Sequence, residues 1–205
     1  MDKTDTPSKR QLKALQTREN LLNAGHAVFL EKGFQKATMT QINTLAKTGY
    51  GTAYLYFQNK DELFTVVMEN IMTKMYEVAD LPFHPQTKQE AYAQINEQTR
   101  LFLQSAIDEK DMMCLIKEAI GVSEFVREKW NQIRARFISG IIKDITYVQQ
   151  AGLAKRRGNA SLLAKGWFYM NEQLMWDLVL DEIPDDIHDI AATLTSLYTE
   201  GVYES

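Results

Sequence analysis

Between residues 126 and 148 the chain carries an apolar side chain at every third or fourth position. This interval matches the turn of an α-helix and places the apolar side chains on one face. The stripe consists of Val126, Trp130, Ile133, Phe137, Ile141, Ile145 and Val148. Shorter stripes of the same period recur along most of the chain. We therefore expect an all-α fold of about nine helices that bury these faces against one another.

The segment 38–64 predicts two short helices joined by a tight turn, followed by the start of a third helix. Thr38 and Gln41 have the spacing of a capping box at the start of the first helix. The apolar spacing then breaks at residues 47–49, where Gly49 permits a turn. Ala53 and Phe57 are four residues apart and mark the inner face of the second helix. This order is that of a helix-turn-helix, whose second helix enters the major groove of DNA.

The residues GTAYLYF at 51–57 and NKDEL at 59–63 resemble the recognition helix and the following helix start of TetR/AcrR repressors. Upstream matches to the pattern of this family are Gly33-Phe34, Thr38, Ile42 and Ala46. The resemblance covers about residues 17–64. Lys47 and Gly49 differ from it, because the family usually has Gly and a Ser-like cap at these two positions.

The resemblance implies two domains and a tail. We expect a flexible basic arm over residues 1–16, a three-helix DNA-binding domain over 17–62, and a helical ligand-binding and dimerisation domain over 63–205. Within the DNA-binding domain, the first helix is predicted to run from about residue 17 to 32 and to end at Gly33. A helix beginning at Lys60, with Asn59 as its cap, should lead into the second domain and end before Pro82 and Pro85.

The resemblance and the helix-turn-helix pattern together assign DNA contacts to nine residues. They are Thr38, Thr40, Gly49, Tyr50, Gly51, Thr52, Tyr54, Tyr56 and Lys60. The rings of Tyr54 and Tyr56 could instead close the small helical core, and Lys60 could be an exposed solvating lysine. Tyr50 and Thr40 are the positions expected to set sequence preference.

The charge distribution favours a nucleic-acid partner at the N-terminal end. The net charge of the chain is −4, yet residues 1–60 contain nine Lys/Arg and four Asp/Glu. A basic surface of this kind attracts phosphates. Lys9, Arg10, Lys13 and Arg18 could contact DNA or could serve solubility alone. The basic run 155–157 is expected to be a solvated loop, because it lies far from the helix-turn-helix in sequence.

The second domain is expected to hold a mostly apolar effector and to form the dimer. Ligand contacts are predicted for Met68, Phe102, Met113, Trp130, Phe137, Trp167, Met170 and Asn171, and Glu172 is a further polar candidate. Each of these apolar residues could also be ordinary core. By resemblance, the last two helices form the dimer interface through Leu163, Trp167, Leu174, Leu178, Ile187, Ile190, Leu194 and Leu197.

We therefore interpret the chain as a ligand-responsive transcriptional regulator, a repressor that binds a palindromic operator of double-stranded DNA as a homodimer. An alternative is a helical protein–protein adaptor that has lost DNA binding. We expect neither catalysis nor a metal or cofactor, since the three histidines are scattered and no nucleotide-binding, metalloprotease or hydrolase motif occurs. The single cysteine, Cys114, and the lack of a signal peptide or a long apolar run suggest a cytoplasmic protein without membrane contact.

Overall fold

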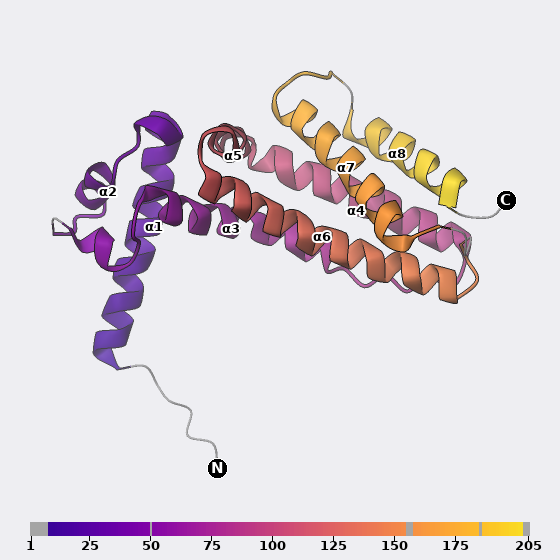
Figure 1. Cartoon of the computed structure of the whole chain (residues 1–205), viewed down its shortest axis with the longest axis horizontal. Helices are drawn as coiled ribbons and strands as arrows, with labels where there is room; N and C mark the ends of the chain where they lie inside the picture. Colours follow the sequence, from indigo (N-terminus) through magenta and orange to yellow (C-terminus); the bar gives the residue numbers. More distant parts are fainter. Residues whose placement is uncertain (1–7, 50, 155–157, 185, 203–205) are drawn as a thin grey trace, which may run out of the picture. The chain divides into compact units, whose positions relative to one another are not determined.

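The computed structural model describes residues 8–49, 51–154, 158–184 and 186–202, and in these ranges the chain is helical without a strand (Figure 1). The elements are α1 (Lys9–Lys36), α2 (Met39–Leu45), the 3₁₀ helix η1 (Thr52–Leu55), α3 (Lys60–Ala79), α4 (Lys88–Asp108), α5 (Lys110–Val122), α6 (Glu124–Gln150), α7 (Ala160–Val179) and α8 (Ile187–Val202). The all-α prediction is confirmed. No helix in these ranges is long and apolar enough to cross a bilayer.

The chain groups into two compact units. The first comprises Met1–Asn70 and Leu115–Lys129, and the second Ile71–Cys114 and Trp130–Ser205. The first unit thus extends beyond the expected domain 17–62. It includes the first half of α3 and a segment from α5 and α6, tied to it by a hydrogen bond of 2.6 Å from Ser123 Oγ to Asp61 Oδ2.

The core of the first unit is built on three phenylalanines. Phe64 of α3 meets Phe29 and Phe34 edge to face, with ring centroids 4.8 and 4.9 Å apart. α1 and α3 approach closely at Gly25, where a Cβ atom would lie 2.3 Å from Leu63 Cδ2. This packing holds α1 and α3 together, α2 contacts α1, and η1 contacts α2.

Local signals explain where several helices begin. Thr38 Oγ1 accepts from the N–H of Gln41, whose Oε1 accepts from the N–H of Thr38, so the predicted capping box is confirmed. Asn59 Oδ1 likewise accepts from the N–H of Glu62 and caps α3 as expected. α3 then ends at Ala79, before the two prolines.

The expected flexible arm is wrong for residues 9–16, because α1 already begins at Lys9. A second capping box starts it: Ser8 Oγ accepts from Gln11 N, and Gln11 Oε1 accepts from Ser8 N. Residues 1–7 lie outside the described ranges. The predicted break at Gly33 is confirmed, since its φ of 77° interrupts the helix.

The second unit is a helical bundle. α4 contacts both α7 and α8, and α7 contacts α8. The part of α6 from Trp130 onward packs on α7, where Trp130 and Trp176 lie 5.1 Å apart. Between these helices Phe137 lies among Phe102 and Phe168, with ring centroids 5.7 and 5.6 Å away. This aromatic group borders the pocket described below.

Candidate nucleic-acid interface and pocket

The turn after α2 has the hydrogen bonds of a Schellman motif. Lys47 N–H donates to Thr44 O at 3.2 Å, and Thr48 N–H donates to Asn43 O at 3.1 Å. This motif needs a left-handed residue, usually glycine, just after the helix. Lys47 occupies that position with a φ of 53°. Lys47, which stands where the TetR/AcrR pattern usually has Gly, is therefore the strained residue of the turn.

The side chain of Asn43 joins α2 to η1. Its Nδ2 donates to Met39 O at 3.0 Å, and its Oδ1 accepts from Thr48 Oγ1 at 2.9 Å and from Ala53 N–H at 3.0 Å. The residue is buried, so its polar atoms depend on these partners. This role of Asn43 was not predicted from the sequence. An asparagine directly beside the buried Ile42 was the available signal.

The second helix of the motif is a short 3₁₀ helix rather than an α-helix. Gly51 precedes it with a φ of 82° and no side-chain cap. Only four residues are helical, and Ala53 alone is fully buried among them. The predicted second short helix is present as one 3₁₀ turn, and neither Gly49 nor Gly51 offers a side chain that could cap a longer helix.

Most of the residues predicted to contact DNA lie on the accessible surface of α2, the turn and η1. Thr38, Thr40, Gly49 and Tyr54 are exposed, whereas Gly51, Thr52 and Tyr56 are half-buried, and Tyr50 lies outside the described residues. The Thr38 hydroxyl is already used in capping. Leu55, which the sequence analysis missed, is 84% exposed. An exposed leucine on this turn is available for apolar contact with a thymine methyl group.

Lys60 has a structural role that neither sequence-based alternative included. Its Nζ donates to Phe34 O at 2.8 Å and to Gln35 O at 2.9 Å, both near the C-terminal end of α1. The ammonium group also lies 4.8 Å from the centre of the Phe34 ring. A cation at a helix C-terminus stabilises the unpaired carbonyls there. A phosphate contact by Lys60 stays a prediction.

Basic side chains on the first turns of α1 are accessible. Lys9, Arg10 and Lys13 are exposed there, in the part of α1 that extends beyond the predicted helix. Arg18 instead lies 5.4 Å from the centre of the Phe57 ring. The basic run 155–157 falls outside the described residues.

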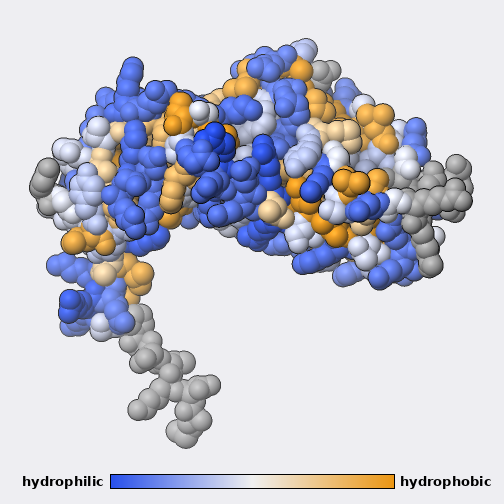
Figure 2. All heavy atoms as spheres, viewed as in Figure 1, coloured by the Kyte–Doolittle hydropathy of each residue, from blue (hydrophilic) through white to orange (hydrophobic). Residues whose placement is uncertain are grey.

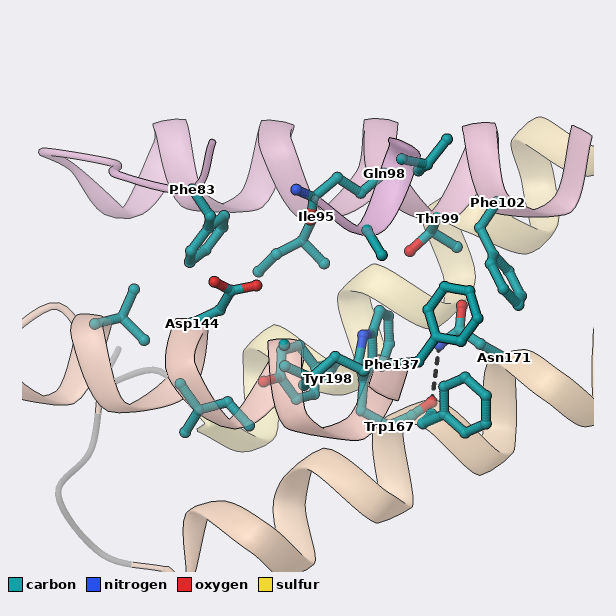
Figure 3. A pocket seen from close by; sticks show the side chains of 17 residues that line it. Phe83, Ile95, Gln98, Thr99, Phe102, Phe137, Asp144, Trp167, Asn171 and Tyr198 are labelled. Carbon is teal, nitrogen blue, oxygen red and sulfur yellow. Dashed lines mark hydrogen bonds between the residues drawn. The ribbon is translucent and has the colours of Figure 1, made fainter. Parts of the chain in front are cut away.

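The second unit contains a pocket with a volume of about 100 Å³ (Figure 3). Its wall consists of Val78, Ala79, Phe83, Ile95, Gln98, Thr99, Phe102, Phe137, Gly140, Ile141, Asp144, Ile145, Val148, Trp167, Phe168, Asn171 and Tyr198. Six of these residues are aromatic. A mostly apolar wall with a few polar groups is typical of a small-molecule site.

Four of the eight predicted ligand residues line this pocket: Phe102, Phe137, Trp167 and Asn171. The other four lie elsewhere. Met68 and Met113 are fully buried core, Trp130 is buried beside Trp176, and Met170 is exposed. Periodicity places a residue on the inner face of a helix, but it does not reveal which part of that face borders a void.

The two polar candidates on α7 already have partners. Asn171 Nδ2 donates to Trp167 O at 2.8 Å within the helix. Glu172 does not line the pocket, because its carboxylate accepts from Arg134 Nε at 2.8 and 2.9 Å and from Trp130 Nε1 at 2.6 Å. Glu172 is thus part of an internal network between α6 and α7.

The pocket instead contains a carboxylate that was missed. Asp144 of α6 lines the wall, and Figure 3 shows its carboxylate pointing toward Phe83 and Ile95. Burial raises the pKa of this group to about 7, and the charge of Lys143 only partly opposes the shift. The sequence signal was an acidic residue three positions after Ile141, within the apolar stripe of this helix.

The residues predicted for the dimer interface divide between the interior and the surface. Trp167, Leu178, Ile190 and Leu194 are buried within the single chain, Leu163, Leu174 and Ile187 are half-buried, and Leu197 is exposed. Other large apolar side chains on α7 are also exposed: Leu162, Tyr169 and Met170. Figure 2 shows hydrophobic residues as separate groups among hydrophilic ones on the face it presents. The apolar residues accessible to a second subunit thus differ in part from the eight residues predicted for the dimer interface.

The remaining groups with possible catalytic or metal-binding chemistry are the single thiol and the His, Asp and Glu side chains. Burial raises the pKa of the Cys114 thiol, so the thiol is uncharged at neutral pH. Its Sγ donates to Val179 O at 3.6 Å. Within the described part of the chain, no three His, Cys, Asp or Glu side chains are close enough together to hold a metal ion.

Comparison with known proteins agrees with this organisation. Residues 21–67 match the model of the family described as bacterial regulatory proteins, tetR family. The chain is 33% identical over 79 residues to the uncharacterized HTH-type transcriptional regulator YhgD of Bacillus subtilis, covering 36% of this chain and 41% of that protein. It is 42% identical over 62 residues to the HTH-type transcriptional repressor NicS of Pseudomonas putida, covering 30% and 29%.

These two alignments therefore span less than half of either relative. The fold match extends further: the structure of the SmeT–triclosan complex superposes with a TM-score of 0.71 over 92% of each chain, at 15% identity. The named relatives are transcriptional regulators rather than enzymes. The chain therefore resembles TetR-family regulators in sequence over residues 21–67 and in fold over the ranges that the structure describes.

Proposed function

We propose that the protein binds an operator as a homodimer, acts as a repressor, and is released from DNA by a small molecule bound in the second unit. The observation that carries the DNA-binding part is the accessible surface of α2 and η1. It presents Thr40, Tyr54 and Leu55, and the buried Asn43 side chain holds its two helices together. Such a surface meets base edges and phosphates in a major groove.

Regulation is supported by the pocket and by the continuity of α3. Val78 and Ala79, at the end of α3, line the pocket, whereas its first turns belong to the first unit. A ligand that contacts these two residues therefore acts on the same helix that begins at the DNA-binding motif. The solved SmeT structure holds triclosan, and NicS is a named repressor, which supports a ligand-released repressor here.

The dimer is proposed from the symmetry of operators. A protein with one helix-turn-helix per chain reads two half-sites as a pair, with recognition elements about 34–36 Å apart. Leu197 of α8 and the exposed apolar residues of α7 are the surface that such a partner would cover. Leu197→Glu should yield monomers in sedimentation experiments and weaken operator binding, because a buried unpaired carboxylate opposes association.

The test is the selection of genomic DNA fragments over a series of salt concentrations, using wild type, Tyr54→Ala and Leu55→Ala. The protein should retain specific fragments, affinity should fall steeply with salt, and both variants should lose the fragments. Leu81→Ala is a matched control, since Leu81 is an exposed leucine in the second unit. It should bind as wild type does. If no fragment is selected and all proteins behave alike, the DNA-binding role is refuted.

A further inference from the structure

Asp144 is the one charged residue in the pocket wall. The other wall residues are apolar, aromatic or neutral and polar. No hydrogen bond or ion pair joins its carboxylate to any residue that the structure describes, and the charge of Lys143 next to it in sequence is the cationic influence on it. This half-buried carboxylate in a mostly apolar wall loses part of its hydration and has no cationic partner among the described residues to offset that loss.

The contrast with Glu172 is informative. Glu172 is buried in the second unit, more deeply than the half-buried Asp144, and Arg134 and Trp130 donate to its two oxygens. Among the described residues, the fold therefore supplies a cationic partner to Glu172 and none to Asp144. The other wall residues come from α3, the segment after it, α4, α6, α7 and α8, and none of them carries a positive charge.

The aromatic rings of the wall, like the carboxylate of Asp144, favour a positively charged ligand. Trp167 and Tyr198 stack with centroids 4.4 Å apart, and Phe137 and Phe168 stack at 5.6 Å. Ring faces attract an organic cation through their quadrupoles, most strongly where water is excluded. A negatively charged effector would instead meet a carboxylate with no compensating base.

We propose that the effector is an organic cation, an ammonium group on an apolar body, and that Asp144 is its counter-ion within the aromatic wall. This inference rests on the proposed function only in taking the pocket as the effector site. The sequence led to the expectation of a mostly apolar effector, and the proposal adds that this molecule carries a positive charge.

The proposal implies a pH dependence of binding. Lys143 on the same helix is the charged group that acts on Asp144, and Tyr198 of α8 is the other ionisable residue of the wall. The wall residues from α3, α4 and α7 do not titrate. Because the pKa of Asp144 is about 7, its ionised fraction rises about tenfold between pH 6 and pH 8. A cation should therefore bind about tenfold more tightly at pH 8 than at pH 6.

The experiment uses choline and its neutral isostere 3,3-dimethylbutan-1-ol, in which carbon replaces the charged nitrogen. Binding to the full chain without DNA is measured by calorimetry at both pH values. We expect choline to bind at least tenfold more tightly than the alcohol at pH 8, and only the choline affinity to fall at pH 6. Asp144→Asn should abolish both differences. Glu128→Gln, which removes an exposed carboxylate from the same helix, should preserve them.

Equal binding of the two probes, undiminished choline binding by Asp144→Asn, or no choline binding at either pH would overturn the proposal. Circular dichroism of the variant verifies its fold, and retained binding of the alcohol shows that its pocket is intact. A different result would refute the proposed function while leaving the cation site in place. Choline that binds through Asp144 without releasing operator DNA would support the cation site and refute the ligand-released repressor.

Discussion

At the scale of single residues, Lys47 holds a backbone conformation that its side chain disfavours. Its φ of 53° lies in the left-handed region, where a Cβ atom costs about 1 kcal/mol or more. Lys47→Gly should therefore raise the free energy of unfolding by about 0.5–1 kcal/mol, less than the full strain because glycine also gains freedom in the unfolded chain. Thermal denaturation measures the change. Lys47→Ala keeps the strain, so an equal gain in that variant would contradict this explanation.

Asp144 affects stability through its protonation. Its pKa is raised in the folded protein to about 7 from an ordinary value of 3.8. Below the ordinary value the carboxyl is neutral in both states and costs nothing. As the pH rises from about 4 to 7, only the unfolded chain ionises freely, so the folded state loses stability. Asp144→Asn should therefore raise the melting temperature by several degrees at pH 8 and leave it unchanged at pH 4. A gain of equal size at both pH values would contradict the shift.

At the scale of helices, α2 and η1 depend on one side chain. In Asn43→Ala the buried N–H of Ala53 loses its acceptor, and an unsatisfied buried donor costs about 1–3 kcal/mol. We expect a loss of stability of that size, measured by urea denaturation, and a loss of DNA affinity because η1 is no longer fixed. Thr44→Ala is the control on the same helix, where the residue is exposed, and its effect should stay within about 0.5 kcal/mol. Equal losses of stability in the two variants would contradict the role of Asn43 in holding α2 and η1 together.

The same scale shows which features were accessible from the sequence. The caps at Thr38 and Asn59, the break at Gly33 and the stripe of α6 were predicted correctly, because each arises from residues within a few positions of one another. The start of α1 was missed since its first turns have no buried face, although Ser8 and Gln11 carried a capping signal. Contacts over long sequence separations stayed hidden.

Lys60 and Asp144 illustrate those long separations. The bonds of Lys60 to Phe34 O and Gln35 O cross about 25 residues, so its sequence neighbours did not indicate them. In the sequence Asp144 lies beside the apolar stripe of α6, and only its neighbours from α4, α7 and α8 make it part of a pocket wall. For the same reason the pocket residues could not be separated from the core: burial is set by what a helix faces, which periodicity does not specify.

At the scale of the whole molecule, α3 and α6 each contribute residues to both the first unit and the pocket, and α3 begins directly after the helix-turn-helix segment. If the position of α3 depends on the ligand, the affinities for choline and for the operator must be coupled. Thermodynamic linkage then requires one factor for both: choline weakens operator binding by as much as the operator weakens choline binding. We expect a factor of about 5–150, the usual range for such coupling.

Two titrations measure this factor, one of DNA with and without saturating choline at pH 8, the other of choline with and without operator. The two ratios should agree in wild type and in Glu128→Gln. In Asp144→Asn the factor should fall to one at the same choline concentration, because the cation no longer occupies the pocket. A factor of one in wild type, with choline demonstrably bound, would show that α3 does not transmit the occupancy of the pocket. The effector site and the DNA-binding surface would then be independent, and the regulation of this protein would have to act through another surface.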